Sequence, residues 1–287
     1  MTRAFLPELP ALMIEDQVRA ALVEDLGRAG DITSNATIGP ELTATAEMNC
    51  RETGVIAGLP LAEAAFRLID PAIDFKALVT DGERVEPGAG IARITGPARG
   101  VLSAERVALN YLMHLSGIAT HTARFADETA HTKARVTCTR KTIPGLRAVE
   151  KYAVRCGGGS SHRYGLDDAI LIKDNHIAVA GGISEALRAA KAFAGHLVRI
   201  EIEVDTLEQF REVLEEGADV CLLDNMGPDL LREAVAMNNG RITLEASGNV
   251  NLDTVRAIAE TGVDYISTSK ITMAAPTLDI GLDIAIG

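Results

Sequence analysis

Cationic side chains are concentrated in one stretch of the chain, between Thr139 and His176. The stretch holds Arg140, Lys141, Arg147, Lys151, Arg155, Arg163 and Lys173, together with His162 and His176. Because the whole chain has a formal net charge of -12, this basic island indicates a local anion site and not a general affinity for polyanions. Gly, Ser, Thr, Asn and Asp lie between the cations, and this mixture suits a pocket for a small, highly charged ligand.

Six short apolar runs end in polar or charged residues. The runs are 135–139, 169–173, 198–204, 219–224, 242–247 and 264–268. Their ends carry Thr139, Arg140, Lys141; Lys173, Asp174, Asn175; Glu203, Asp205; Asp224, Asn225; Ser247, Gly248, Asn249; and Ser267, Thr268, Ser269. Paired acids such as Glu203 and Asp224 can hold Mg²⁺ together with substrate phosphate oxygens, and Gly- and Ser/Thr-rich loops bind phosphate through backbone N–H groups. These residues predict a phosphorylated sugar, a metal ion and a separate anionic partner.

The runs alternate with amphipathic helix patterns near 184–193, 206–216, 228–238 and 251–260. This alternation predicts a parallel sheet covered by helices. The number of strands favours a closed or nearly closed β/α barrel over an open doubly wound sheet. The sequence has no GxGxxG motif at a strand–helix turn, which argues against dinucleotide binding. In such a barrel the polar strand ends meet at the C-terminal mouth, where active sites form.

The first half of the chain has a different pattern. We expect a helix over 11–25 with Leu12, Val18 and Leu22 on one side, and a long helix over 103–127 with Ser103 as its N-cap. Extended segments are expected at 43–58, 73–79 and 91–95, with a turn at 81–82 and a helix over 60–69.

Composition restricts the class of protein. The acidic balance argues against nucleic acid as the main partner. The four cysteines are far apart and form no CxxC pair, so reduced thiols are expected and neither structural zinc nor a disulfide framework. The N-terminal segment MTRAFLPELPALM has too short an apolar run for a signal peptide, and no segment approaches the length of a membrane span. We therefore expect a soluble cytoplasmic protein with no membrane partner.

Simpler explanations exist for several of these residues. Helical spacing favours a solvated surface for Arg147, Lys151 and Arg155, whereas the strand-end positions of Arg140, Lys141 and Lys173 favour a site. His162 fits a plain loop residue as well as a ligand-binding one. The glycines at 157–159 fit either a linker or a lid.

Two other classes of protein fit the same residues. In a Schiff-base lyase or aldolase, Lys141 or Lys173 would be a desolvated nucleophile. A non-catalytic anion-binding or scaffold protein would avoid acids such as Glu203 and Asp224 among its cations.

The segment CTRKTIPGLRAVEKYAVRCGGGSSHRYGLDDAILIKDNH resembles the signature of the quinolinate phosphoribosyltransferase family. The resemblance covers nearly the whole chain, because EDLGRAGDITS, RVALNYLMHLSGIAT, IEIEVDTLEQ, LLDNM and LEASGNV also resemble family motifs and follow in the same order. A related transferase that acts on another small anion, as in molybdate-linked metabolism, is the third alternative. The complete set of cations argues for quinolinate.

The resemblance implies an N-terminal α/β sandwich domain over residues 1–113, joined by a returning segment 275–287, and an incomplete β/α (TIM-like) barrel over 114–274. It implies transfer of the phosphoribosyl group of 5-phosphoribosyl-1-pyrophosphate to quinolinate, with release of pyrophosphate and carbon dioxide, to give nicotinate mononucleotide for NAD synthesis. It also implies Mg²⁺ as cofactor and a homodimer or larger homo-oligomer. No protein nucleophile is needed, so positioning and electrostatics carry the catalysis.

The resemblance also assigns roles to residues. Arg106 would reach into the neighbouring subunit's site, and Lys141, Glu203 and Asp224 would be catalytic, with both acids near the ribose and Mg²⁺. The substrate-binding set is completed by Thr139, Arg140, His162, Arg163, Lys173, Ser247, Gly248, Asn249, Thr268, Ser269 and Lys270. Two loops depart from the family pattern: SGG becomes Ser247-Gly248-Asn249, and a loop close to SVGALTHS becomes STSKITMA, with Ser269, Lys270 and Met273 as the changed residues.

Overall fold

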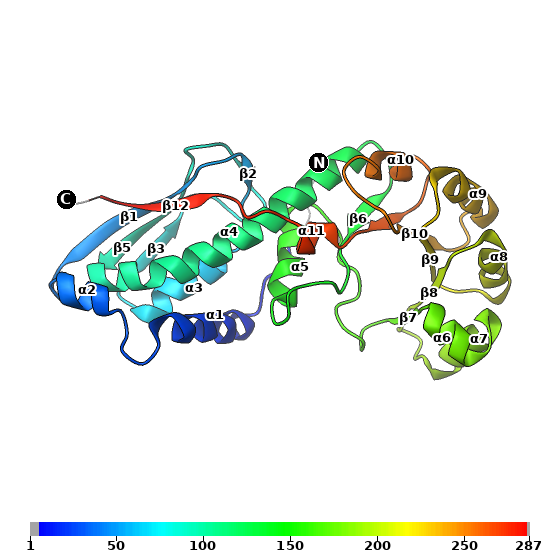
Figure 1. The fold of residues 1–287 in the computed structure, drawn as a ribbon, viewed down its shortest axis with the longest axis horizontal. Coiled ribbons are helices and arrows are strands. Elements are labelled where there is room, and N and C mark those ends of the chain that lie inside the picture. The colour runs from blue at the N-terminus through cyan, green and yellow to red at the C-terminus, as the bar shows by residue number, and fades with distance from the viewer. Residues whose placement is uncertain (1–5, 286–287) are drawn as a thin grey trace. The chain divides into compact units, whose positions relative to one another are not determined.

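The computed structural model describes residues 6–285 of the chain (Figure 1). The first five residues of the N-terminal segment, and the last two of the predicted returning segment, lie outside the described residues. The chain divides into two compact units. One comprises Met1–His121, Ala148–Gly158 and Ala275–Gly287, and the other comprises Thr122–Arg147 and Gly159–Ala274.

The first unit is built on an antiparallel sheet of strand order β12-β1-β5-β3. Its strands are β1 (Thr43–Cys50), β3 (Asp74–Ala77), β5 (Gly90–Pro97) and β12 (Ile280–Ala285), and a second small sheet pairs β2 (Gly54–Val55) with β4 (Arg84–Val85). Its helices are α1 (Ala11–Leu26), α2 (Ile32–Thr37), α3 (Leu59–Ile69), most of α4 (Ala98–Thr129) and most of α5 (Arg147–Cys156). Figure 1 shows strand β12 beside β1, which brings the C-terminal segment back to the first unit.

Two details of the predicted helices were wrong. Helix α1 buries Ile14, Val18 and Leu22, whereas Leu12 is 79% exposed. Helix α4 begins five residues earlier than expected, at Ala98, so Ser103 lies inside it. The Ser103 hydroxyl instead donates a hydrogen bond to Asp31, which caps α2.

Helix α5 packs in the first unit through buried polar contacts. Asp81 accepts the backbone N–H groups of Gly58 and Leu59 at the start of α3 and the Tyr152 hydroxyl of α5 at 2.7 Å. Lys151 is only 4% exposed, so the expected solvated position was wrong for this residue. A helix buried on several sides leaves no outer face for a charge in the middle of its sequence.

The second unit is an incomplete β/α barrel, as predicted. Its strands are β6 (Arg135–Thr137), β7 (Ile170–Ile172), β8 (Ile200–Val204), β9 (Val220–Asp224), β10 (Thr243–Ser247) and β11 (Tyr265–Ser267), and every pairing is parallel. Its helices are α6 (Asp174–Ala180), α7 (Ile183–Phe193), α8 (Leu207–Glu216), α9 (Pro228–Asn238), α10 (Val255–Ala259) and α11 (Lys270–Met273). Strands β6 and β7 are the two ends of the sheet order β6-β11-β10-β9-β8-β7, so the barrel is open between them.

Most positions of these strands are apolar because helices cover the outer face of this sheet. Strand β8 buries four of its five residues, Glu201 among them, and Cys138 and Cys221 are buried cysteines, as expected. Within residues 6–285, every helix is too short or too polar to cross a lipid bilayer.

Candidate active site

A cavity of about 870 Å³ lies at the C-terminal ends of the barrel strands. Its walls contain every predicted site residue except Arg106, namely Thr139, Arg140, Lys141, His162, Arg163, Lys173, Glu203, Asp224, Ser247, Gly248, Asn249, Thr268, Ser269 and Lys270. Arg106 does not line this cavity; it lies on α4 in the first unit and is exposed. Segments that are up to 131 residues apart in the chain therefore form one hollow, although the role of each residue stays a prediction.

Two guanidinium groups lie close together in this cavity. The Nε atoms of Arg140 and Arg163 are both buried and have no hydrogen-bond partner. Burial and the nearby charge of Arg140 lower the pKa of Arg163, while Glu201 and Asp168 oppose that shift. Placing two like charges side by side in a partly buried pocket is unfavourable unless an anion neutralises them. The pair is thus suited to binding a carboxylate ligand.

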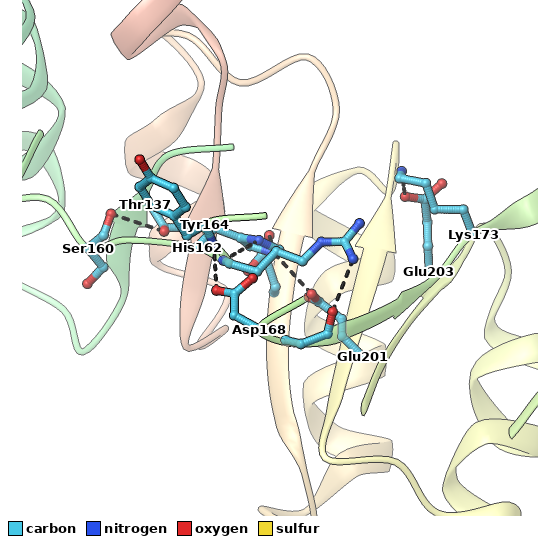
Figure 2. A network of polar contacts seen from close by, with 11 residues as sticks. Thr137, Ser160, His162, Tyr164, Asp168, Lys173, Glu201 and Glu203 are labelled. Carbon is cyan, nitrogen blue, oxygen red and sulfur yellow. Dashed lines mark hydrogen bonds and ion pairs between the residues drawn. The ribbon is translucent and has the colours of Figure 1, made fainter. Parts of the chain in front are cut away.

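The loop that carries Arg163 is held by several hydrogen bonds. Asp168 accepts the backbone N–H groups of Tyr164 and Gly165 at 2.6 and 2.9 Å (Figure 2). The Arg163 guanidinium donates to the Ala169 carbonyl oxygen at 3.1 Å. Arg147 donates to the Tyr164 carbonyl oxygen at 3.2 Å. These contacts fix the loop between β6 and β7, and Ser160 at its start forms a parallel bridge with Thr137 of β6.

Parallel pairing brings the two predicted metal ligands to the same wall of the cavity. Glu203 near the end of β8 pairs in register with Leu222, two residues before Asp224 at the end of β9. Glu203 accepts a short contact from the Lys173 ammonium. Asp224 accepts a short hydrogen bond from Ser247, which lies opposite it in the register. The site therefore combines carboxylate oxygens with one fixed ammonium group.

The loop after β10 has a backbone conformation that requires glycine at one position. Gly248 has φ +85°, and a Cβ atom there would lie 2.8 Å from the backbone nitrogen of Asn225, so only glycine fits. Asn249, which replaces a family glycine, has φ +53°. Asn tolerates this left-handed conformation better than most residues, so the substitution keeps the backbone path. Among the other departures, Ser269 and Lys270 line the cavity and Met273 is 57% exposed.

Sequence reasoning missed a buried acidic pair at the cavity, whose wall includes Glu245. Glu201 and Glu245 are 7% and 4% exposed, and His162 Nε2 lies 3.0 Å from Glu201 Oε2 and 3.6 Å from Glu245 Oε1 (Figure 2). Burial, and next the charge of Glu201, raise the pKa of Glu245 from 4.5 to about 7. The alternation of side chains along a strand could have predicted this pair, because Glu201 lies on the same strand face as Glu203, and Glu245 on the same face as Ser247.

The same three residues could also hold a metal ion, since their ligand atoms lie within 4.8 Å of one another. The distance of 3.0 Å between His162 Nε2 and Glu201 Oε2 is that of a direct hydrogen bond. One pair of this group is thus joined by a hydrogen bond, whereas the Oε1 atoms of Glu201 and Glu245 are buried without a hydrogen-bond partner.

Comparisons with known proteins agree with this architecture. Residues 31–116 match the N-terminal domain, and residues 118–283 the C-terminal domain, of the family described as quinolinate phosphoribosyl transferase. The chain is 42% identical over 275 residues to a probable nicotinate-nucleotide pyrophosphorylase (carboxylating) of Bacillus subtilis, covering 96% of this chain and 94% of that protein. It is 41% identical over 296 residues to a mitochondrial quinolinate phosphoribosyltransferase (decarboxylating) of Nicotiana glauca, covering 97% and 84%.

A solved structure of the nicotinate-nucleotide pyrophosphorylase of Francisella tularensis superposes with a TM-score of 0.94 at 37% identity, covering 98% of this chain and 99% of that one. Matches of this extent, over both domains and in both sequence and structure, show that the chain belongs to the quinolinate phosphoribosyltransferase family.

Proposed function

We propose that the cavity at the strand ends is where this chain carries out its family's reaction. As a quinolinate phosphoribosyltransferase (decarboxylating), the chain joins quinolinate to 5-phosphoribosyl-1-pyrophosphate in NAD biosynthesis. The observation that carries the site assignment is the clustering of Arg140, Arg163, Lys141 and Lys173 around one hollow, beside Glu203 and Asp224. Quinolinate and the sugar donor are both anions, and this cluster offsets the repulsion between them.

In this proposal the guanidinium groups of Arg140 and Arg163 bind the two carboxylates of quinolinate. Arg suits this role because its planar fork pairs with a carboxylate through two parallel hydrogen bonds. Lys141 and Lys173 add point charges near the pyrophosphate. The loops at 247–249 and 268–270 bind the 5-phosphate through backbone N–H groups.

The chemistry needs no covalent enzyme intermediate. The bond between ribose C1 and the pyrophosphate oxygen breaks, and the pyridine nitrogen forms a new bond to C1. Glu203, held by Lys173, stabilises the positive charge that develops on the ribose. The carboxylate next to the now positive nitrogen leaves as carbon dioxide, and its electron pair stays on the ring carbon until a proton replaces it.

Glu203 and Asp224 are the residues that would hold Mg²⁺. Their oxygen donors match the preference of this ion, and a pair of carboxylates leaves positions for substrate phosphate oxygens. When bound, Mg²⁺ would neutralise charge on the departing pyrophosphate. Both acids line the cavity that the phosphate loops also line, which supports this assignment.

We also propose a homodimer in which Arg106 completes the partner's site. The exposed position of Arg106, outside the cavity of its own chain, supports this arrangement. The domain boundaries at 113/114 and 274/275, and the cytoplasmic location, stay predictions. The names of two relatives place them in the mitochondrion and the chloroplast.

A Schiff-base mechanism is less well supported. The Lys173 ammonium is engaged by Glu203, and Lys141 is exposed, whereas a lysine nucleophile is normally desolvated and neutral.

The test is to incubate the chain with quinolinate, 5-phosphoribosyl-1-pyrophosphate and Mg²⁺. We expect nicotinate mononucleotide with one equivalent each of pyrophosphate and carbon dioxide. No product from folded protein, or a borohydride-trapped adduct on lysine, would refute the proposal.

A further inference from the structure

The His162 side chain is engaged by protein groups on both sides of its ring. Its Nδ1 atom accepts the backbone N–H of Arg163 at 2.8 Å. Because Nδ1 accepts this hydrogen bond, the single proton of the neutral imidazole must lie on Nε2. Nε2 points at Glu201 Oε2, 3.0 Å away. Protein groups therefore engage both ring nitrogens, although His162 lines the cavity.

Glu201 is well placed to maintain this arrangement. It lies on strand β8, two residues before Glu203 and on the same face of the strand, and it is 7% exposed. A buried carboxylate accepts an N–H strongly, since water does not compete. Its other oxygen, Oε1, has no hydrogen-bond partner. The direct contact of Glu201 in this network is thus the histidine ring.

We propose that Glu201 is a positioning residue for quinolinate binding: it holds His162 with the proton on Nε2, so that Nδ1 fixes the backbone of Arg163 and, through it, the guanidinium in the cavity. This inference rests on the proposed function of the cavity. It places Glu201 outside the groups that touch substrate, and it gives His162 a role in supporting Arg163. Glu245 Oε1 lies 3.6 Å from the same ring atom, Nε2, and so is a second carboxylate near this proton.

The first measurement needs no variant. Long-range ¹H–¹⁵N spectra of histidine-labelled protein, assigned with His162→Gln, report which ring nitrogen carries the proton. We expect a protonated Nε2 and an unprotonated Nδ1 at neutral pH. A proton on Nδ1 would overturn the proposal, whatever the enzyme's activity.

The second measurement is kinetic and compares two variants of the same residue. Glu201→Ala removes the acceptor, and we expect KM for quinolinate to rise about 10- to 100-fold with a smaller change in kcat. Glu201→Gln keeps an acceptor oxygen and should stay within about threefold of the parent. The matched control is Glu260→Ala, because Glu260 makes the same 3.0 Å contact with His131 away from the cavity; it should leave KM unchanged. Equal effects of the Ala and Gln variants would contradict positioning by hydrogen bonding.

A double-mutant cycle separates action through His162 from direct attraction to Arg163. In a His162→Ala background, Glu201→Ala should add less than about a twofold change in KM, because the intermediary is gone. Persistence of the full effect would show that Glu201 acts directly on the guanidinium, and the proposal would fail while the proposed function of the cavity stood. Absence of product from the parent enzyme would instead remove the function, and the tautomer measurement would still decide the positioning.

Discussion

Arg163 provides the sharpest test of the cavity as a quinolinate site. Its guanidinium has one fixed contact, to the Ala169 carbonyl, and a buried Nε without a partner. A fork to one substrate carboxylate would add two charge-assisted hydrogen bonds, each contributing about 1.5–3 kcal/mol. Removal of Arg163 also relieves its repulsion with Arg140, which offsets part of the loss. We therefore expect Arg163→Ala to weaken binding by about 3 kcal/mol, or about 100-fold in Kd.

The assay is isothermal titration calorimetry with quinolinate alone. Arg163→Lys keeps the charge but not the fork, so an intermediate loss of about tenfold is expected. Arg199→Ala is the control, since Arg199 is exposed and does not line this cavity. Binding by Arg163→Ala within about threefold of the parent, with the control also unchanged, would show that this arginine does not receive a carboxylate.

Three further results are expected. Mixing Arg106→Ala subunits with Arg163→Ala subunits should restore part of the activity, because one site of a mixed dimer is then intact; no recovery after verified subunit exchange would exclude a contribution across the interface. Because the pKa of Glu245 is raised in the folded state, its contribution to the free energy of unfolding is full below pH 4.5 and is lost as pH rises to about 7. Between pH 5 and 8, the free energy of unfolding of Glu245→Gln, measured with urea, should therefore rise by up to about 3 kcal/mol relative to that of the parent. A difference that does not vary with pH would refute this assignment. Gly248→Ala should weaken binding of the sugar donor because its φ of +85° and the neighbouring backbone exclude a Cβ atom, whereas Asn249→Gly should bind normally, as measured by KM; equal KM values for the two variants would contradict the turn geometry.

Much of the site could be predicted because its residues share one local signal. Polar residues that end apolar β-rich runs must lie at the same edge of a parallel sheet, and Arg140, Lys173, Glu203 and Asp224 all follow this rule. The alternation of strands and helices predicted the barrel for the same reason. Length and side-chain periodicity are local properties, so they can be recognised before any contact is known.

Other features needed the tertiary structure. Helix α5 joins the first unit through the contact between Asp81 and Tyr152. The periodicity of the helix cannot predict this contact, because the two residues are 71 positions apart in the chain. Glu201 and Glu245 lie inside strands, and their common contact with His162 depends on how β8 and β10 curve around the barrel interior.

The sequence by itself therefore determined most of the charged groups that line the cavity and their order along the chain. Only the folded chain decided which groups touch, because the choice of neighbouring strands and the burial of a charge depend on contacts between distant segments. The pairing of β11 with β6 is one such choice: it sets the Thr272 hydroxyl against the Lys141 carbonyl oxygen at 2.8 Å, across 131 residues of chain.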